Sequence, residues 1–338
     1  MRKARRRLGL IIGAVVSGFF LWMALGDLHL RAVWEGIRRA NYLWVAPGLA
    51  VYFLSVWVRS WRWAFLLRGA RPLSGARLFP LMVMGYMGND LFPFRLGEVL
   101  RAYLLWRREA INFGTTLTTA LVERLFDGLT MVLFVFIGLL FVPLEGTLRR
   151  AAVMGAVIFI GALFLFLWLA AHPHLMRRWA ETVIAHLVPR RWQAPLLALV
   201  EGVVEGLSVF RSPWETLVAF GLTLVVWLLE TGKYALVSLA FGMHLPLPVV
   251  LLMAGSINLL TALPSLPGYV GLFETGIDIL AWTGVDPTAA ASYILVLHAL
   301  LWFPVVALGL YYLFREGLSW GEVRRLAEEG EAIAVEEA

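Results

Sequence analysis

The sequence predicts an all-α integral membrane protein with about six full transmembrane helices and two re-entrant helical hairpins. Three observations lead to this prediction: an apolar composition, stretches long enough to cross a bilayer, and two apolar segments interrupted by Gly and Pro. Hydrophobic residues make up 60% of the 338 residues and charged residues only 15%, whereas a soluble domain is about one quarter charged. We therefore treat residues 1–338 as a single membrane domain and exclude a soluble cytosolic enzyme.

Full spans are expected wherever about 20 predominantly apolar residues follow one another. The first such stretch follows the basic segment MRKARRR, and it is longer than the apolar region of a signal peptide, so we expect a retained helix. The six stretches that meet the length requirement are 8–25, 43–67, 115–142, 152–171, 216–240 and 289–314.

Two further apolar segments, residues 78–107 and 248–282, are broken by turn sequences. The first contains FPFRLG and the second LPSLPG. Each half has about 12–15 residues, or roughly 20 Å of helix, which is too short for a hydrocarbon core of about 30 Å. We expect both segments to form re-entrant hairpins. Broken backbone at this depth is tolerated where it is buried in protein or lines a watery cavity.

The basic residues predict the orientation. With the N-terminus inside, most of the 29 Lys and Arg residues fall in the segments that face the cytoplasm, as the positive-inside rule requires. We therefore expect a multi-pass protein of the plasma membrane with both termini cytoplasmic. The charged residues 321–338 read as a short cytoplasmic tail.

A weak internal repeat relates residues 43–142 (repeat one) to residues 214–314 (repeat two). Each runs span, broken hairpin, span. Asn89 and Glu98 of the first hairpin match Asn258 and Glu274 of the second in position. In the predicted topology the two repeats enter the membrane from opposite sides, so we expect an inverted-topology repeat, which is a transporter architecture.

Charged residues inside the apolar segments are the candidate site. An ionisable side chain is costly in the bilayer and usually faces a bundle interior or cavity. Arg95 and Arg101 flank the start of the second half-helix of the first hairpin, where free N–H groups would help to hold a phosphate or carboxylate. The alternative is that acids and bases simply neutralise one another between helices. The candidate substrate-binding residues are Arg59, Arg62, Asn89, Arg95, Glu98, Arg101, Glu123, Arg124, Asp127, Glu230, Lys233, Asn258 and Glu274.

The remaining patterns favour packing over chemistry. The sequence contains no Cys, and no nucleophile motif, phosphate loop or dinucleotide fingerprint lies in a suitable context. We expect no catalytic residue, no metal and no cofactor, and no nucleic-acid partner, since the Arg residues flank apolar stretches. His298 is interpreted as a packed histidine, and residues 174–210 as an amphipathic stretch on anionic lipid.

Three segments resemble a known family. The runs NDLFPFRLGEVLRAYLL, TTALVERLFDG and NLLTALPSLPGYVGLFE are similar to the flippase-like membrane domain of lysylphosphatidylglycerol synthases, and the resemblance covers residues 10–315. Its motif positions are Asn89, Pro93, Arg95, Gly97, Glu98, Arg101, Glu123, Arg124, Asp127, Pro264, Pro267, Gly268, Gly271 and Glu274.

In the larger synthases this domain moves an aminoacylated phospholipid between leaflets, and a separate soluble domain makes that lipid. The present chain has no counterpart of the soluble domain, so synthase activity is not expected. The resemblance implies a translocase for a lipid with an anionic or zwitterionic headgroup, including polyprenyl-linked sugars. Two alternatives stay open: an intramembrane transferase with Glu98 or Glu123 as general base, and an ion or small-solute secondary transporter.

Overall fold

The computed structural model describes residues 30–92, 97–141, 172–187, 213–261, 269 and 274–317, with isolated positions between 154 and 197. Every regular element within these ranges is a helix. In chain order they are α2 (Leu30–Arg39), the short 3₁₀ helix η1 (Tyr42–Trp44), α3 (Val45–Leu67), α4 (Gly75–Leu91), α5 (Gly97–Glu109), α6 (Phe113–Phe141), α8 (Pro173–Leu187), α10 (Pro213–Leu239), α11 (Leu247–Leu260), α12 (Thr275–Trp282) and α13 (Pro287–Arg315).

Four helices are long and apolar enough to cross a membrane. They are α3 together with η1, α6, α10 and α13, and their apolar stretches run for 26–29 residues, or about 40 Å at 1.5 Å per residue. The chain is thus a multi-pass helical membrane protein. The other two expected spans, 8–25 and 152–171, lie outside the described residues apart from isolated positions, so the count of six stays a prediction.

Shorter helices occupy the two interrupted segments. The helices α4 and α5 lie in the first, α11 and α12 in the second, and most of the residues between the members of each pair lie outside the described part. The helix α12 has eight residues, fewer than the sequence suggested. Gly284 follows its end with φ +90°, a left-handed conformation that commonly terminates helices. That these pairs are re-entrant hairpins remains a prediction.

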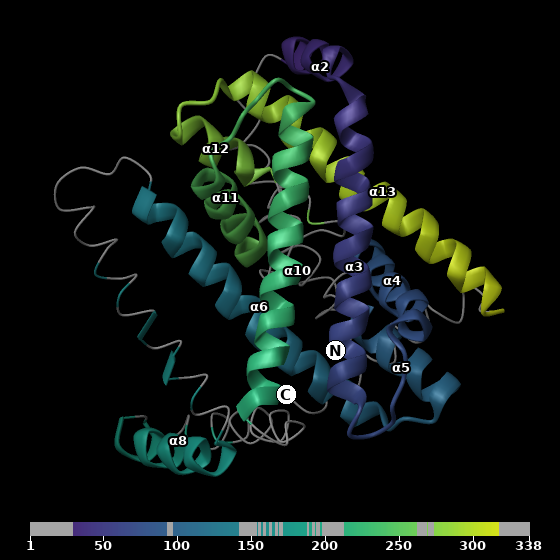
Figure 1. Ribbon diagram of the computed structural model, residues 1–338, viewed down its shortest axis with the longest axis vertical. Coiled ribbons are helices and arrows are strands. Elements are labelled where there is room, and N and C mark those ends of the chain that lie inside the picture. Colours follow the sequence, from purple (N-terminus) through teal and green to yellow (C-terminus); the bar gives the residue numbers. More distant parts are fainter. Residues whose placement is uncertain are drawn as a thin grey trace, which may run out of the picture.

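Helices of one half of the chain pack against helices of the other half. The helix α4 packs along α13, α11 packs along α6, and α3 lies beside α10 (Figure 1). Glycines permit two of these approaches. A Cβ added to Gly309 of α13 would lie 2.5 Å from Met87 of α4, and one added to Gly138 of α6 would lie 2.6 Å from Leu252 of α11. The first short helix of each interrupted segment, α4 or α11, therefore fits closely against the final long helix of the opposite half.

Large apolar side chains lie on the outside of the long helices as well as in the core. Leu54, Leu228 and Phe303 are exposed on α3, α10 and α13, as lipid-facing positions would be. The charged helices α2 and α8 lie across opposite ends of the bundle (Figure 1). Between these ends, the long helices contain buried charged side chains, among them Arg62 and Asp127.

Candidate functional site

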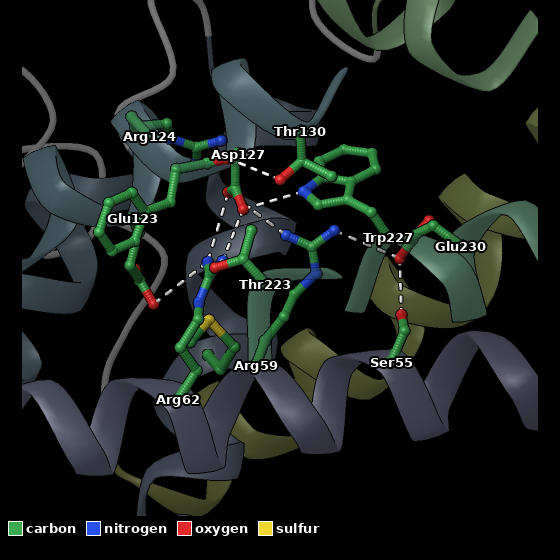
Figure 2. A network of polar contacts seen from close by, with 12 residues as sticks. Ser55, Arg59, Arg62, Glu123, Arg124, Asp127, Thr130, Thr223, Trp227 and Glu230 are labelled. Atoms are coloured by element: carbon green, nitrogen blue, oxygen red, sulfur yellow. Dashed lines mark hydrogen bonds and ion pairs between the residues drawn. The ribbon is translucent and has the colours of Figure 1, made fainter. Parts of the chain in front are cut away.

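A buried ion pair joins α3 to α6. The Nη1 and Nη2 atoms of Arg62 donate to the two carboxylate oxygens of Asp127 at 2.6 and 3.3 Å, and Nη1 also donates to Thr223 at 2.9 Å (Figure 2). Both charged side chains are 3% exposed. Trp227 of α10 donates its indole N–H to the same carboxylate at 2.9 Å. Asp127 is therefore held by α3 and α10 together.

Arg59, one turn before Arg62 on α3, extends the network toward α10. Its guanidinium lies 3.6 Å from Asp127 and 3.5 Å from Glu230 (Figure 2), and 4.9 Å from the ring of Trp227. Glu230 also accepts a hydrogen bond of 2.6 Å from Ser55 and forms an ion pair with Lys233. A single cation thus bridges carboxylates from two helices, in a setting where low dielectric strengthens each contact.

The first interrupted segment is tied to α6 by two more ion pairs. Arg101 of α5 lies 2.7 Å from Glu123, and its guanidinium lies 4.3 Å from the ring of Trp63. Glu98 pairs with Arg124. These contacts join α5 to α6 through residues that are 22 and 26 positions apart in the chain.

Asn89 of α4 binds the backbone at the start of α5. Its side-chain oxygen accepts a hydrogen bond of 2.9 Å from the backbone N–H of Gly97, the first residue of α5. A Cβ on Gly97 would lie 1.8 Å from the carbonyl oxygen of Gly85, so only glycine allows this approach. The backbone N–H of Gly97, one of the groups expected from the sequence to bind an anion, therefore already has a hydrogen-bond partner within the protein.

Two adjoining cavities lie along this network. The smaller, about 20 Å³, is lined by α3, α4, α5 and α6. The larger, about 150 Å³, is lined by residues from both halves of the chain. Four side chains, Arg59, Tyr86, Asn89 and Arg124, border both cavities, so polar groups continue from one to the other.

The larger cavity has charged and aromatic walls. Its cations are Arg59, Arg124 and Lys233, and its carboxylates are Asp90 and Glu230. Its other lining residues are Tyr52, Tyr86, Asn89, Met131, Trp227, Asn258, Thr261, Tyr269, His298, Leu301 and Trp302. A cavity with several donors and two carboxylates can hold a charged or zwitterionic group, because the charges are desolvated and already oriented.

All but one of the candidate residues lie within the described part; Arg95 is outside it. Eight line the smaller cavity: Arg59, Arg62, Asn89, Glu98, Arg101, Glu123, Arg124 and Asp127. Glu230, Lys233 and Asn258 line the larger one. Glu274 lines neither, but it lies 2.7 Å from Nδ1 of His298. The structure thus brings these residues together, and their role in binding stays a prediction.

Sequence reasoning gave too little weight to three cavity residues. Asp90 directly follows Asn89 at the helix break, and His298 follows Glu274 by nearly the spacing that separates Glu98 from Glu123; both are usable signals. Trp227 is one of 15 Trp residues, a type that is enriched at membrane interfaces, but its N–H binds Asp127 inside the bundle. The sequence position of a Trp does not tell whether its side chain lies at the membrane interface or binds a buried carboxylate.

Comparison with known proteins covers nearly the whole chain. The family model described as "Lysylphosphatidylglycerol synthase TM region" matches residues 10–309. A UPF0104 membrane protein of Methanothermobacter thermautotrophicus is 24% identical over 89% of this chain and 92% of its own length. A second relative, from Methanocaldococcus jannaschii and also a UPF0104 membrane protein, is 22% identical over 83% and 87% of the two chains.

A third relative has an enzyme name. Glycosyltransferase AglD of Haloferax volcanii is 27% identical over 87% of this chain, which spans about half (52%) of AglD. No solved structure gives a significant match. The match of the family model to residues 10–309, on a helical bundle with four long apolar helices, shows that the chain belongs to the family of the transmembrane region of lysylphosphatidylglycerol synthases.

Proposed function

We propose that this protein is a lipid translocase that moves a polar-headed phospholipid or polyprenyl-linked lipid between the leaflets of the plasma membrane. One observation carries the proposal: a charged cavity lined by residues from both halves of the chain lies inside a bundle whose outer surface is apolar. This cavity would hold the headgroup while the acyl or prenyl tail stays in the bilayer.

The cations of the cavity supply the headgroup contacts. Arg59, Arg124 and Lys233 line it and have carboxylate partners within the protein. A phosphate would compete for these donors, and the carboxylates would hold the cations in position when no lipid is bound. Arg124 is the most accessible of the three, with 40% of its side chain exposed, so we assign it the first contact with the headgroup.

An inverted repeat would supply the alternation between leaflets. The reciprocal packing of α4 on α13 and of α11 on α6 supports two structurally related halves that enclose the cavity. In transporters of this kind one repeat rocks against the other around a fixed site. With both termini cytoplasmic, such rocking would open the cavity first to one leaflet and then to the other.

An intramembrane transferase is the second candidate, and the name of the AglD relative favours it. A general base must be able to accept a proton from the substrate. Both carboxylates considered for this role are ion-paired, Glu98 with Arg124 and Glu123 with Arg101. The ion pairs favour translocation over this chemistry. A solute transporter of the same architecture would need a cavity open to water alone.

Translocation is tested in proteoliposomes that contain an acyl-labelled fluorescent phosphatidylglycerol or a labelled prenyl phosphate. A membrane-impermeant quencher reports the fraction of label that reaches the outer leaflet. Wild-type protein should accelerate exchange, and Arg124→Gln should abolish the acceleration while folding normally. Arg177→Gln is the matched control, because Arg177 lies on α8, outside the cavity lining, is exposed and pairs with Glu181 four residues further along the same helix. Equal rates for the wild type, Arg124→Gln and protein-free vesicles would refute the proposal.

A further inference from the structure

Two titratable residues that line the larger cavity, Asp90 and His298, come with a third, Glu274, which contacts His298. His298 comes from α13, Glu274 immediately precedes α12, and Asp90 lies near the end of α4. Nδ1 of His298 lies 2.7 Å from Oε1 of Glu274, and the two side chains are 15% and 3% exposed. The residues belong to both halves of the chain, so their relative position depends on how the halves are packed.

Asp90 differs from the other cavity carboxylates. Glu98, Glu123, Asp127 and Glu230 each form an ion pair with Arg or Lys. Within the described ranges Asp90 forms no hydrogen bond or ion pair, although it borders the same cavity as His298 and interacts with it electrostatically. A carboxylate in this setting lacks the cation that would keep it ionised, so it is suited to taking up a proton.

The contact with Glu274 determines which ring nitrogen of His298 carries a hydrogen. An ionised carboxylate only accepts hydrogen bonds, so Nδ1 carries the hydrogen and Nε2 becomes the atom that gains or loses a proton. Histidine is the side chain whose charge ordinarily changes between pH 5 and 8. The other titratable or charged groups that face this cavity are Tyr52 and Arg59 of α3, Tyr86 of α4, Arg124 of α6, Glu230 and Lys233 of α10, and Tyr269. Asp278 lies on α12, one turn after Glu274.

We propose that Asp90 and His298 form a proton-binding site that couples lipid movement to a proton gradient across the membrane. The inference rests on the proposed translocase and adds its energy source. A proton from water on one side is held by the imidazole or the Asp90 carboxyl while the headgroup occupies the cavity. It is released to water on the other side, and no other bond forms or breaks. A phosphate that crosses with one proton moves with its negative charge neutralised.

The coupling has a quantitative consequence. If one proton accompanies each lipid, a difference of about one pH unit sustains a roughly tenfold excess of lipid in one leaflet at steady state, since each tenfold ratio corresponds to the same free energy as one pH unit. An uncoupled translocase gives equal occupancy of the leaflets at any gradient. The leaflet distribution therefore separates proton coupling from simple exchange.

The test uses wild-type proteoliposomes with labelled phosphatidylglycerol in the bilayer and a pH-sensitive dye trapped inside. An imposed pH difference should produce both leaflet asymmetry and lipid-dependent proton flux. Asp90→Asn and His298→Gln should leave the leaflets equally labelled and show no lipid-dependent proton flux. His244→Gln is the matched control, because His244 is exposed in the segment between α10 and α11, and it should behave as the wild type.

The outcomes separate the two proposals. If wild-type protein moves no label under any gradient, the translocase proposal itself fails. If it exchanges lipid but the leaflets stay equal and no proton flux accompanies exchange, the proton site is overturned and translocation stands. Retained asymmetry in both Asp90→Asn and His298→Gln would also overturn the site. Melting temperatures of the two variants, compared with that of His244→Gln, identify a variant that has simply lost its fold, and Glu274→Gln then supplies an independent substitution at the same pair.

Discussion

Arg62 of α3 binds Asp127 of α6 through both Nη atoms, at 2.6 and 3.3 Å, and both side chains are almost completely buried. The pair connects the two helices at the centre of the bundle, and Arg59 binds the same carboxylate at 3.6 Å. Burying these charges is costly in itself, and the pairing offsets that cost only while every partner is present. The pair is therefore the most sensitive point of the polar network.

Replacing Asp127 by Asn should destabilise the protein by about 3–5 kcal/mol, because the buried Arg59 and Arg62 would lose the carboxylate that they share and would keep their contacts of 3.5 Å to Glu230 and Glu123. A thermal melt of the detergent-solubilised protein measures the loss. The matched control is Glu181→Gln, which removes an exposed carboxylate from the local pair with Arg177 on α8; such pairs contribute little. Equal melting temperatures for Asp127→Asn and wild type would show that the buried pair does not stabilise the bundle.

The long helices were predictable because their signal is local. The stretches 43–67, 115–142, 216–240 and 289–314 match α3, α6, α10 and α13 to within a few residues, since about 20 apolar residues suffice to define a span. Gly and Pro likewise marked the interruptions, because their backbone effects act within a few residues.

The pairing of the charges was not predictable in the same way. Arg62 and Asp127 are 65 residues apart in the chain, and their contact depends on how α3 and α6 rotate and pack. The same holds for His298 and Glu274: spacing suggested a relation, but a packed histidine and a paired histidine look alike in sequence. Geometry between helices was required to distinguish structural pairs from cavity residues.

Gly138→Ala should destabilise the contact between α6 and α11 by about 1–3 kcal/mol, as overpacking does in well-packed interiors. The new Cβ would lie 2.6 Å from Cβ of Leu252 and 2.8 Å from the carbonyl oxygen of Pro248, and a backbone atom cannot move aside cheaply. Gly128→Ala in the same helix is the control, because nothing lies within 4 Å of its added Cβ, and alanine favours helix. Opposite signs of the two changes in melting temperature are expected, and equal changes would contradict the close packing.

Arg101→Gln and Arg124→Gln should fail in different ways. The side chain of Arg101 is 7% exposed, with its guanidinium bound to Glu123 and close to the ring of Trp63, so its loss should lower the yield of folded protein. Arg124→Gln should fold normally and lose lipid exchange. Size-exclusion profiles and proteoliposome exchange rates, measured on the same preparations, distinguish the two effects. The assignment of Arg124 to the headgroup is wrong if Arg124→Gln exchanges lipid at the wild-type rate.

Arg95 lies outside the described residues, and the sequence assigns it to the headgroup. Arg95→Gln should therefore resemble Arg124→Gln, with normal folding and lost exchange, because a contact made with the lipid headgroup does not contribute to the stability of the protein itself. A fall in folded yield like that of Arg101→Gln would instead make Arg95 part of the structural ion pairs.

The predicted orientation is testable because the chain contains no Cys, so single cysteines can be introduced without background labelling. Trp34 of α2 and Trp179 of α8 are both more than half exposed and lie on helices at opposite ends of the bundle (Figure 1). With cytoplasmic termini, Trp34→Cys should react with a membrane-impermeant maleimide on intact cells, whereas Trp179→Cys should react only after permeabilisation. Leu67→Cys, at a fully buried position, controls for non-specific reaction. The reverse pattern would place the basic segments outside, contrary to the positive-inside rule, and would also reverse the direction in which the proton gradient acts on the cavity.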